Sequence, residues 1–160
     1  SPYSWTKAKN IELIKNYSNW FNLKFSIVYF YNVYGRYQIK NHFMSAVIAI
    51  FEEQYLKNEY LTVVKPGNQR RDFTNVKDIV YGTVLAALKG ENEEFHLGTG
   101  KNYKVADVAR MFSKKIKFIN ERKGERFSSK SIITKARRKL GYKPKYVLEK
   151  YIEDFKKNIK

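Results

Sequence analysis

The sequence predicts an α/β fold in which helices and strands alternate along the chain. Segments with apolar residues at helical spacing alternate with short segments rich in β-branched and aromatic residues. One of these segments, KFSIVYFYNV (24–33), is apolar on both faces, which is typical of a strand buried in a parallel sheet. The other candidate strands are short, so the chain holds fewer long strands than such a sheet needs. We therefore expect part of a larger α/β domain.

Residues 2–20 are predicted to form one helix. Pro2 suits the first turn of a helix, and Ser1 can cap it. Apolar residues then recur at helical spacing, namely Trp5, Ala8, Ile11, Leu13, Ile14, Tyr17 and Trp20. The pattern breaks near Asn22, which places the end of the helix just before the strand at 24–33.

The remaining elements follow from periodicity and from turn residues. Residues 34–41 are predicted to be a loop and 65–69 a turn. Asn75 is expected to cap a helix, with Asp78 completing a near capping box, and Gly90 is expected to end that helix. Helices are predicted at 44–58, 76–89, 105–115, 133–141 (closed by Gly141) and 148–158. Short strands are predicted at 60–64, 71–76 and 93–98.

Composition excludes several classes of protein. The 160 residues contain no cysteine, which excludes disulfides and cysteine-based zinc sites. The longest apolar run is far too short to span a bilayer, and no signal-peptide pattern is present, so we expect a cytoplasmic protein that does not bind a membrane. Two isolated histidines, His42 and His96, have no ligand partners in the sequence and suggest no metal.

A net charge of +17 raises the alternative of nucleic-acid binding. The lysines, however, are spread over the whole length, and no helix-turn-helix, zinc-finger or aromatic RNA-binding motif supports that function. We expect no nucleic-acid partner. A basic chain also favours anionic small molecules such as nucleotides.

The first ten residues, SPYSWTKAKN, place Tyr3 four residues before Lys7. A tyrosine hydroxyl alone is a poor base at neutral pH, because its ordinary pKa is about 10. A lysine one helical turn further along shares a helix face with the tyrosine, and its ammonium favours the phenolate. Such a pair can exchange a proton with an alcohol while hydride moves to or from a nicotinamide. The spacing alone is weak evidence, because the chain is rich in both residue types.

Several segments, in order, strengthen this interpretation. PYSWTK resembles the Pro-Tyr-x-x-Ser/Thr-Lys motif of the extended short-chain dehydrogenase/reductases, and YFYNVYG (29–35) resembles the Arg-Tyr-Phe-Asn-Val-Tyr-Gly strand end of nucleotide-sugar epimerases. KPGNQRRDFTNVKDIV (65–80) is similar to their Gly-x-Gln-x-Arg-Asp-Phe segment. Residues 93–112 and 121–152 resemble the Asn-Ile-Gly-x-Gly and Arg-Pro-Gly-Glu segments with the helices that follow each. The resemblance covers essentially the whole chain and is nearest to UDP-glucose 4-epimerase and its relatives.

The resemblance implies the C-terminal part of a Rossmann-type fold plus the small α/β substrate-binding domain. Residues 1–35 would end the NAD-binding domain, and 36–160 would form mainly the nucleotide-sugar domain, with 70–92 returning to the Rossmann core. The family places a Rossmann half with a glycine-rich loop ahead of the tyrosine, so we expect that half to be missing here. The same resemblance implies NAD as cofactor, a UDP-sugar as substrate, and a homodimer formed through the helix that carries Tyr3.

Site residues also follow from the resemblance. Tyr3 would be the acid/base, Lys7 would assist it and bind the nicotinamide ribose, and the backbone of Phe30 would lie against the nicotinamide. Asn32 and Arg71 match residues that bind the nucleotide diphosphate. Arg122 and Glu125 match residues that hold the phosphates and the nucleotide ribose. Structural alternatives are a turn residue at Asn32, a core side chain at Phe30 and a solvated charged loop at 122–125. Arg70 is expected to be solvated, and Asp72 to hold its loop.

Departures from the family pattern leave the sugar undefined. Tyr29 stands in place of the usual arginine, Arg36 and Tyr37 replace a common Gly-Pro, Lys123 replaces proline, and Ile132 replaces a capping aspartate. The predicted reaction is C4 epimerisation of a nucleotide sugar. The alternatives are a 4,6-dehydratase, which needs an Asp-Glu pair upstream of the tyrosine, and a non-catalytic binding fragment.

One glycine motif is predicted to have no role in dinucleotide binding. Gly98-x-Gly100 follows a strand, but Tyr103 stands where the third glycine of a dinucleotide fingerprint would be. The residues around these glycines also lack the spacing of a Walker A phosphate-binding motif. We therefore predict a plain turn between a strand and a helix.

Overall fold

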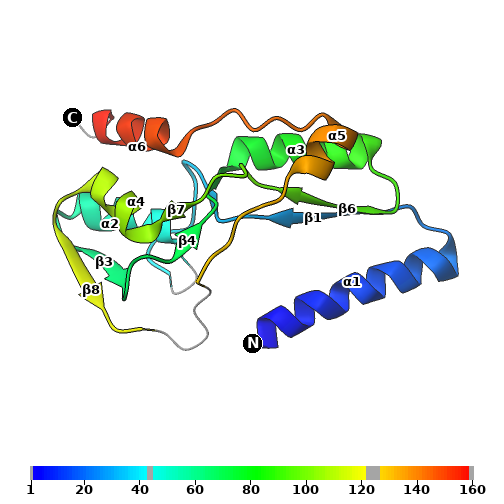
Figure 1. Cartoon of the computed structure of the whole chain (residues 1–160), viewed down its shortest axis with the longest axis horizontal. Coiled ribbons are helices and arrows are strands. Elements are labelled where there is room, and N and C mark those ends of the chain that lie inside the picture. Colours follow the sequence, from blue (N-terminus) through cyan, green and yellow to red (C-terminus); the bar gives the residue numbers. More distant parts are fainter. Residues whose placement is uncertain (1, 43–44, 122–126, 159–160) are drawn as a thin grey trace.

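Two hydrophobic cores organise the computed structural model, which describes residues 2–42, 45–121 and 127–158. One core surrounds the strands at 26–30 and 93–97, and the other lies among the helices at 47–56, 105–112 and 148–157 and the strand at 61–64 (Figure 1). Short strand pairs connect the two. None of the described helices is long and apolar enough to cross a bilayer.

The first core is built on a parallel pair of strands. β1 (Ser26–Phe30) pairs with β6 (Glu93–Leu97) in the register Ser26↔Glu93 to Phe30↔Leu97. α3 (Val76–Lys89) packs on both strands, and α5 (Thr134–Leu140) packs on α3 and β6. Gly82 permits the close approach of α3, because a Cβ there would lie 2.9 Å from side-chain carbons of Leu97 and Tyr142.

The second core contains a second parallel pair. β3 (Leu61–Val64) pairs with β8 (Ile116–Ile119), and α2 (Val47–Leu56), α4 (Val105–Phe112) and α6 (Leu148–Lys157) pack around it. Phe112 makes edge-on contacts with the rings of Phe51 and Phe155. The predicted helix 105–115 was too long, and the strand at 116–119 was not predicted. Its four residues have no distinctive pattern, and pairing with β3 makes them extended.

Short strands link the two cores. β2 (Val33–Tyr34) pairs in parallel with β5 (Thr74–Asn75), and β4 (Arg70–Arg71) pairs antiparallel with β7 (Tyr103–Lys104). β4 and β7 lie between the β1–β6 pair and the β3–β8 pair (Figure 1). These pairings bring residues 32–34, 70–75 and 99–104 together, although they are far apart in the sequence.

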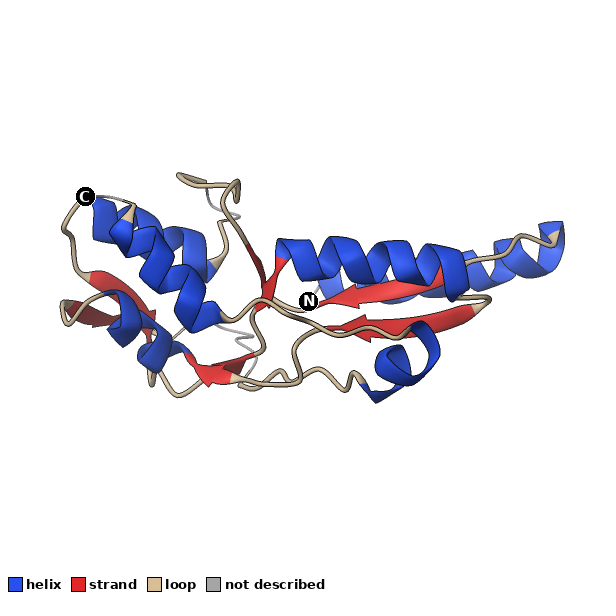
Figure 2. Cartoon of the chain, turned by 90° about the horizontal axis from the view of Figure 1, so that it is seen from above, coloured by secondary structure: helices blue, strands red, loops and turns tan. Residues whose placement is uncertain are grey.

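α1 (Pro2–Phe21) runs alongside β1 and β6, with its N-terminus at the end where these strands finish (Figures 1 and 2). The helix has the predicted extent and buries no residue among those described. Its one ion pair with the sheet joins Lys15 to Glu94, at 2.6 Å, within the described part of the chain. The helix therefore touches the rest of the fold lightly.

Two expectations about individual elements were wrong. The segment 24–33 is not buried on both faces: its first strand residues are half-buried and Phe30 is exposed, because β6 covers one edge of β1 and α3 covers one face. Asn75 does cap α3, accepting a hydrogen bond from the Lys77 N–H at 3.0 Å. Asp78 does not complete a capping box, because its carboxylate accepts bonds from the backbone N–H groups of Lys145 and Tyr146.

The predicted helices near 44–58, 76–89, 133–141 and 148–158 are present, with ends shifted by up to three residues. The division into two domains stays a prediction. The core around β1 also contains residues of β6 and α5, so a Rossmann-type part would include more of the C-terminal sequence than 70–92.

Candidate functional site

A cavity of about 210 Å³ lies between the start of α2, strand β3 and the segment around β4. Its polar lining side chains are Asn32, Ser45, Thr62, Gln69 and Arg71. Its remaining lining residues are Val33, Ala46, Val47, Ile48, Ile50, Val64, Phe73, Val105 and Ile119. An apolar cavity with a few convergent polar groups is the usual form of a small-molecule site.

Asn32, just before β2, and Arg71, in β4, both line this cavity. Asn32 has a φ of +31°, a conformation that asparagine tolerates better than most residues, and this ends β1 before β2 begins. Its side-chain Nδ2 donates to the carbonyl oxygen of Asp72 at 3.0 Å. Two residues 39 positions apart are thus held at the same cavity.

Asp72 is fully buried and fixes the backbone beside Arg71. Its carboxylate accepts bonds from the N–H groups of Thr99 (3.0 Å), Gly100 (2.9 Å) and Ser131 (3.2 Å). The hydroxyls of Thr99 (2.6 Å) and Ser131 also donate to it. The expectation that Asp72 holds its loop is confirmed.

The hydrogen bonds to Asp72 also explain the conformation of the Gly98-x-Gly100 segment. The segment is a bend after β6, as predicted, and Gly98 lies so close to Ser131 and Asp72 that a Cβ would overlap both. The Thr99 and Gly100 N–H groups bind a carboxylate of the same chain. They are therefore already used and do not form a phosphate cradle.

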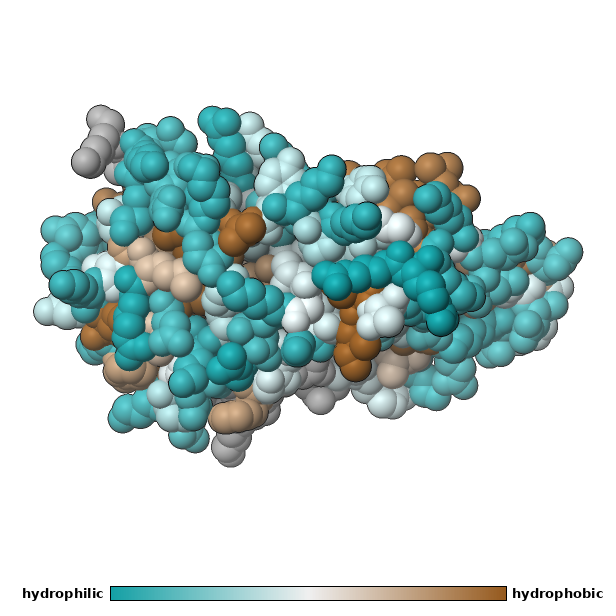
Figure 3. Space-filling view, turned by 45° about the horizontal axis from the view of Figure 1, so that its top comes forward, coloured by the Kyte–Doolittle hydropathy of each residue, from teal (hydrophilic) through white to brown (hydrophobic). Residues whose placement is uncertain are grey.

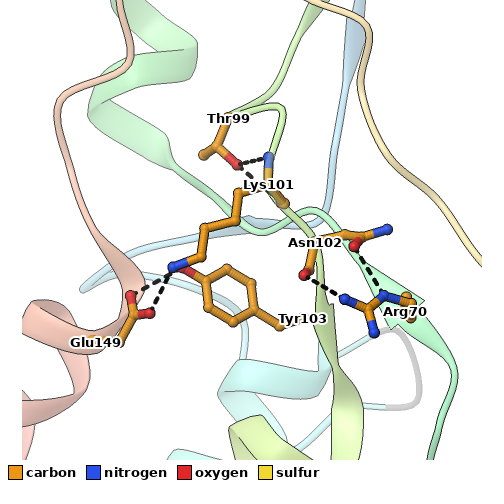
Figure 4. Close-up of polar contacts among 6 residues, drawn as sticks. All are labelled: Arg70, Thr99, Lys101, Asn102, Tyr103 and Glu149. Atoms are coloured by element: carbon orange, nitrogen blue, oxygen red, sulfur yellow. Dashed lines mark hydrogen bonds and ion pairs between the residues drawn. The ribbon is translucent and has the colours of Figure 1, made fainter.

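Arg70 is not solvated, contrary to expectation. The antiparallel pairing of β4 with β7 places Asn102 alongside it, and Arg70 Nε donates to Asn102 Oδ1 at 2.9 Å. Figure 4 shows this contact next to a second one, in which Lys101 and Tyr103 both point toward Glu149 on α6. Burial raises the pKa of Tyr103, so its hydroxyl stays a hydrogen-bond donor to that carboxylate.

The start of α2 adds to the cavity's preference for negative charge. Ala46 is the N-cap residue and makes no side-chain capping bond. Ala46, Val47 and Ile48 all line the cavity, so the first turn of the helix faces it. The positive end of the helix dipole and the Arg71 guanidinium therefore both favour an anion in this cavity.

Tyr3 and Lys7 form a separate group at the start of α1. Lys7 Nζ lies 5.6 Å from the centre of the Tyr3 ring, so the two side chains share a helix face as the spacing predicts. Tyr3 is 67% exposed, and Phe30 at the end of β1 is 52% exposed. Both therefore offer accessible surface at the end where the parallel strands finish.

The predicted site residues thus fall into three sets. Asn32 and Arg71 share the cavity. Tyr3 and Lys7 share the start of α1, at the end of the parallel strands where Phe30 lies. Arg122 and Glu125 lie outside the described residues. Gln69 was not predicted as a site residue. Its buried Nε2 donates to the carbonyl oxygens of Val64 and Lys65 and so shapes one wall of the cavity. Its place in the Gly-x-Gln-x-Arg segment could have indicated it.

Comparisons with known proteins, by sequence and by structure, both find relatives of this chain. The profile of the NAD dependent epimerase/dehydratase family matches residues 1–106. A putative UDP-glucose 4-epimerase of Methanocaldococcus jannaschii is 33% identical over 159 residues, covering 96% of this chain and 51% of the relative. The chain spans about half the length of the curated relatives it matches.

Two solved structures are similar over the whole chain. A UDP-glucose 4-epimerase of Thermotoga maritima, solved with UDP-glucose, is 31% identical with a TM-score of 0.92, and this chain covers 55% of it. A UDP-glucuronic acid 4-epimerase of Bacillus cereus, solved with UDP-glucuronic acid and NAD, is 27% identical with a TM-score of 0.87 and 54% coverage. In both cases 100% of this chain is aligned.

Proposed function

The chain belongs to the NAD dependent epimerase/dehydratase family, and we propose that it supplies the catalytic tyrosine and the sugar-nucleotide site of an NAD-dependent 4-epimerase. The substrate would be a UDP-sugar of the UDP-glucose/UDP-galactose type. One observation carries this proposal: Asn32 and Arg71, from distant parts of the sequence, line one cavity and are joined through Asp72.

The cavity suits the diphosphate end of such a substrate. Arg71 can form paired hydrogen bonds with phosphate oxygens, and the Asn32 amide offers a further donor. The first turn of α2 adds N–H groups and a positive dipole end at the same cavity. Apolar side chains such as Val64 and Ile119 line the rest and can accept the flat face of a base.

The start of α1 suits the chemical step. A bound NAD, held at its nicotinamide-ribose end by Lys7 and the backbone of Phe30, would supply reversible hydride transfer at C4 of the sugar. Tyr3 would accept the proton of the C4 hydroxyl and later return it, and Lys7 on the same helix face would favour the phenolate. Tyr3, Lys7 and Phe30 are accessible at the end of the parallel strands, so they fit the nicotinamide-ribose end of the cofactor.

We test the site through Arg71. Titration of the chain with UDP-glucose by calorimetry should give one site, and Arg71→Ala should weaken binding by about tenfold or more, the effect of removing a charge-assisted pair of bonds. Arg110→Ala is the matched control, because Arg110 is exposed on α4 and pairs with Asp107 of its own helix. Equal affinity of Arg71→Ala and the unmodified chain would contradict the proposed site.

The reaction is tested by its product. Conversion of UDP-glucose to UDP-galactose by a protein that includes this chain supports a 4-epimerase, and it should be lost in Tyr3→Phe. A 4-keto-6-deoxy product would identify a 4,6-dehydratase instead. Because β1 pairs along one edge only within the described residues, we expect the 160-residue chain alone to bind substrate without turning it over. Turnover by the chain alone would contradict this.

We also propose a homodimer formed through α1. The helix exposes large apolar side chains, among them Trp5 (64%) and Trp20 (65%), and Trp20 contacts the rings of Tyr17 and Phe21. An apolar face of this kind is costly in water and favours a partner surface. Sedimentation analysis should show a dimer that Trp20→Lys converts to monomer. A monomeric unmodified chain would contradict the proposal.

A further inference from the structure

A second cavity, of about 550 Å³, lies beyond the ends of β2 and β5. Its volume is within the range of small-molecule sites. Its lining residues are Gly35, Arg36, Tyr37, Asn75, Val76, Lys77, Lys145, Tyr146, Val147, Lys150, Tyr151 and Asp154. None of them lines the cavity that holds Asn32 and Arg71.

Cations from separate parts of the chain converge on this second cavity. Arg36 comes from the loop after β2, Lys77 from the first turn of α3, Lys145 from the segment before α6, and Lys150 from α6. The one acidic lining residue, Asp154, is bonded to Lys150 at 2.7 Å. The lining therefore keeps a net positive charge. Hydrophilic side chains cover much of the face seen in Figure 3, with apolar patches between them.

Buried polar groups hold the backbone of two of these cationic residues, Lys77 and Lys145, in place. Asn75, 6% exposed, accepts the N–H of Lys77 at 3.0 Å. Asp78, 2% exposed, accepts the N–H groups of Lys145 (2.9 Å) and Tyr146 (3.0 Å). The cations thus emerge from a fixed backbone, which lowers the entropy that a ligand would have to overcome.

The position of the cavity favours an anion for a second reason. Ligands of α/β folds bind beyond the carboxyl ends of parallel strands, and β2 and β5 end at this cavity. α3 also begins here, so the positive end of its dipole faces the same space. Lysines bind phosphate as point charges, and the Arg36 guanidinium can bind it through paired bonds.

We propose that this second cavity is a binding site for a small polyphosphate anion, separate from the sugar-nucleotide site. The ligand would be held by Arg36, Lys77 and Lys145. Because β2 and β5 run from residues at the first cavity to residues at the second, a ligand bound here would contact the ends of the two strands that position Asn32 and Phe73.

Inorganic pyrophosphate is the probe. We would titrate the chain with pyrophosphate by calorimetry, at fixed ionic strength and with saturating UDP present to occupy the first cavity. The test variant is Lys77→Gln/Lys145→Gln, which removes two side-chain charges while leaving the backbone bonds. The control is Lys114→Gln/Lys117→Gln, which removes the same charge from exposed positions at β8.

The expected result is one pyrophosphate site that UDP does not displace, weakened roughly tenfold or more in the test variant and little changed in the control. Arg71→Ala should leave it intact. Absence of a site, displacement by UDP, or equal weakening in both lysine pairs would overturn the proposal. UDP-sugar binding is measured separately through Arg71, so failure of the proposed function would not be confused with failure of this one.

Discussion

The buried carboxylate of Asp72 provides the sharpest test of how the candidate site is held. Its two oxygens accept bonds from three backbone N–H groups, those of Thr99, Gly100 and Ser131, and from the hydroxyls of Thr99 and Ser131. Asp72→Asn keeps the size of the side chain but replaces one acceptor oxygen by an NH₂ donor. The perturbation therefore removes hydrogen-bond acceptance without creating a cavity.

The magnitude follows from the pattern of donors. If the new NH₂ group takes the place of Oδ1, the Thr99 N–H loses its acceptor. If it takes the place of Oδ2, the Ser131 N–H loses its acceptor and the Gly100 N–H keeps only its bond to Ser131 Oγ. Each unsatisfied buried donor costs about 1–3 kcal/mol, and the remaining bonds lose their charge assistance. Neutralising a buried charge returns part of its desolvation cost. We expect the free energy of unfolding to fall by about 3 kcal/mol.

Urea unfolding followed by circular dichroism measures this loss. Thermal unfolding gives a second measure. In a chain of this size each kcal/mol lowers Tm by about 2–4 °C, so we expect the Tm of Asp72→Asn to fall by about 6–12 °C. Asp107→Asn is the control, because Asp107 is exposed and pairs with Arg110 on its own helix. Its free energy of unfolding should change by no more than about 0.5 kcal/mol. A loss in Asp72→Asn no larger than that of the control would refute the account of Asp72 as the anchor of the site.

Three further predictions concern other contacts. The hydrogen bond from Lys15 lowers the pKa of Glu94 below its ordinary 4.5, so the stabilising contribution of Glu94 is fully present above pH 4.5 and is lost as the pH falls through the lowered value. The stability difference between the unmodified chain and Glu94→Gln, measured by urea unfolding, should therefore shrink below pH 4.5, and a constant difference would contradict this. Gly82→Ala should cost about 1–3 kcal/mol in urea unfolding, because its Cβ would lie 2.9 Å from Leu97, and unchanged stability would show that α3 can move away. Gly141→Ala should lower the free energy of unfolding in urea by only about 1 kcal/mol, because its φ of +71° strains an alanine but no atom lies within 4 Å of the new Cβ. A much larger loss would show that the new side chain meets another part of the chain.

Features with a local cause could be predicted from the sequence. The helical spacing of α1 places Tyr3 and Lys7 on one face, and the structure shows the two side chains together. Asn75 caps α3 and Gly141 ends α5 in the left-handed conformation, because capping depends on a few neighbouring residues. The order of the motif segments along the chain was enough to indicate the family.

Features with a distant cause required the tertiary structure. Asp72 contacts Thr99, Gly100 and Ser131, which are 27 to 59 residues away, and Asp78 leaves the expected capping box for backbone N–H groups 67 and 68 residues away. Strand β8 is extended because β3 lies beside it, and neither cavity has a pattern in any single segment. The spacing of residues along the sequence decides which face of a helix or strand each side chain occupies. Only the folded chain decides which distant donors and acceptors meet there, because a buried polar group must find its partners wherever the packing brings them.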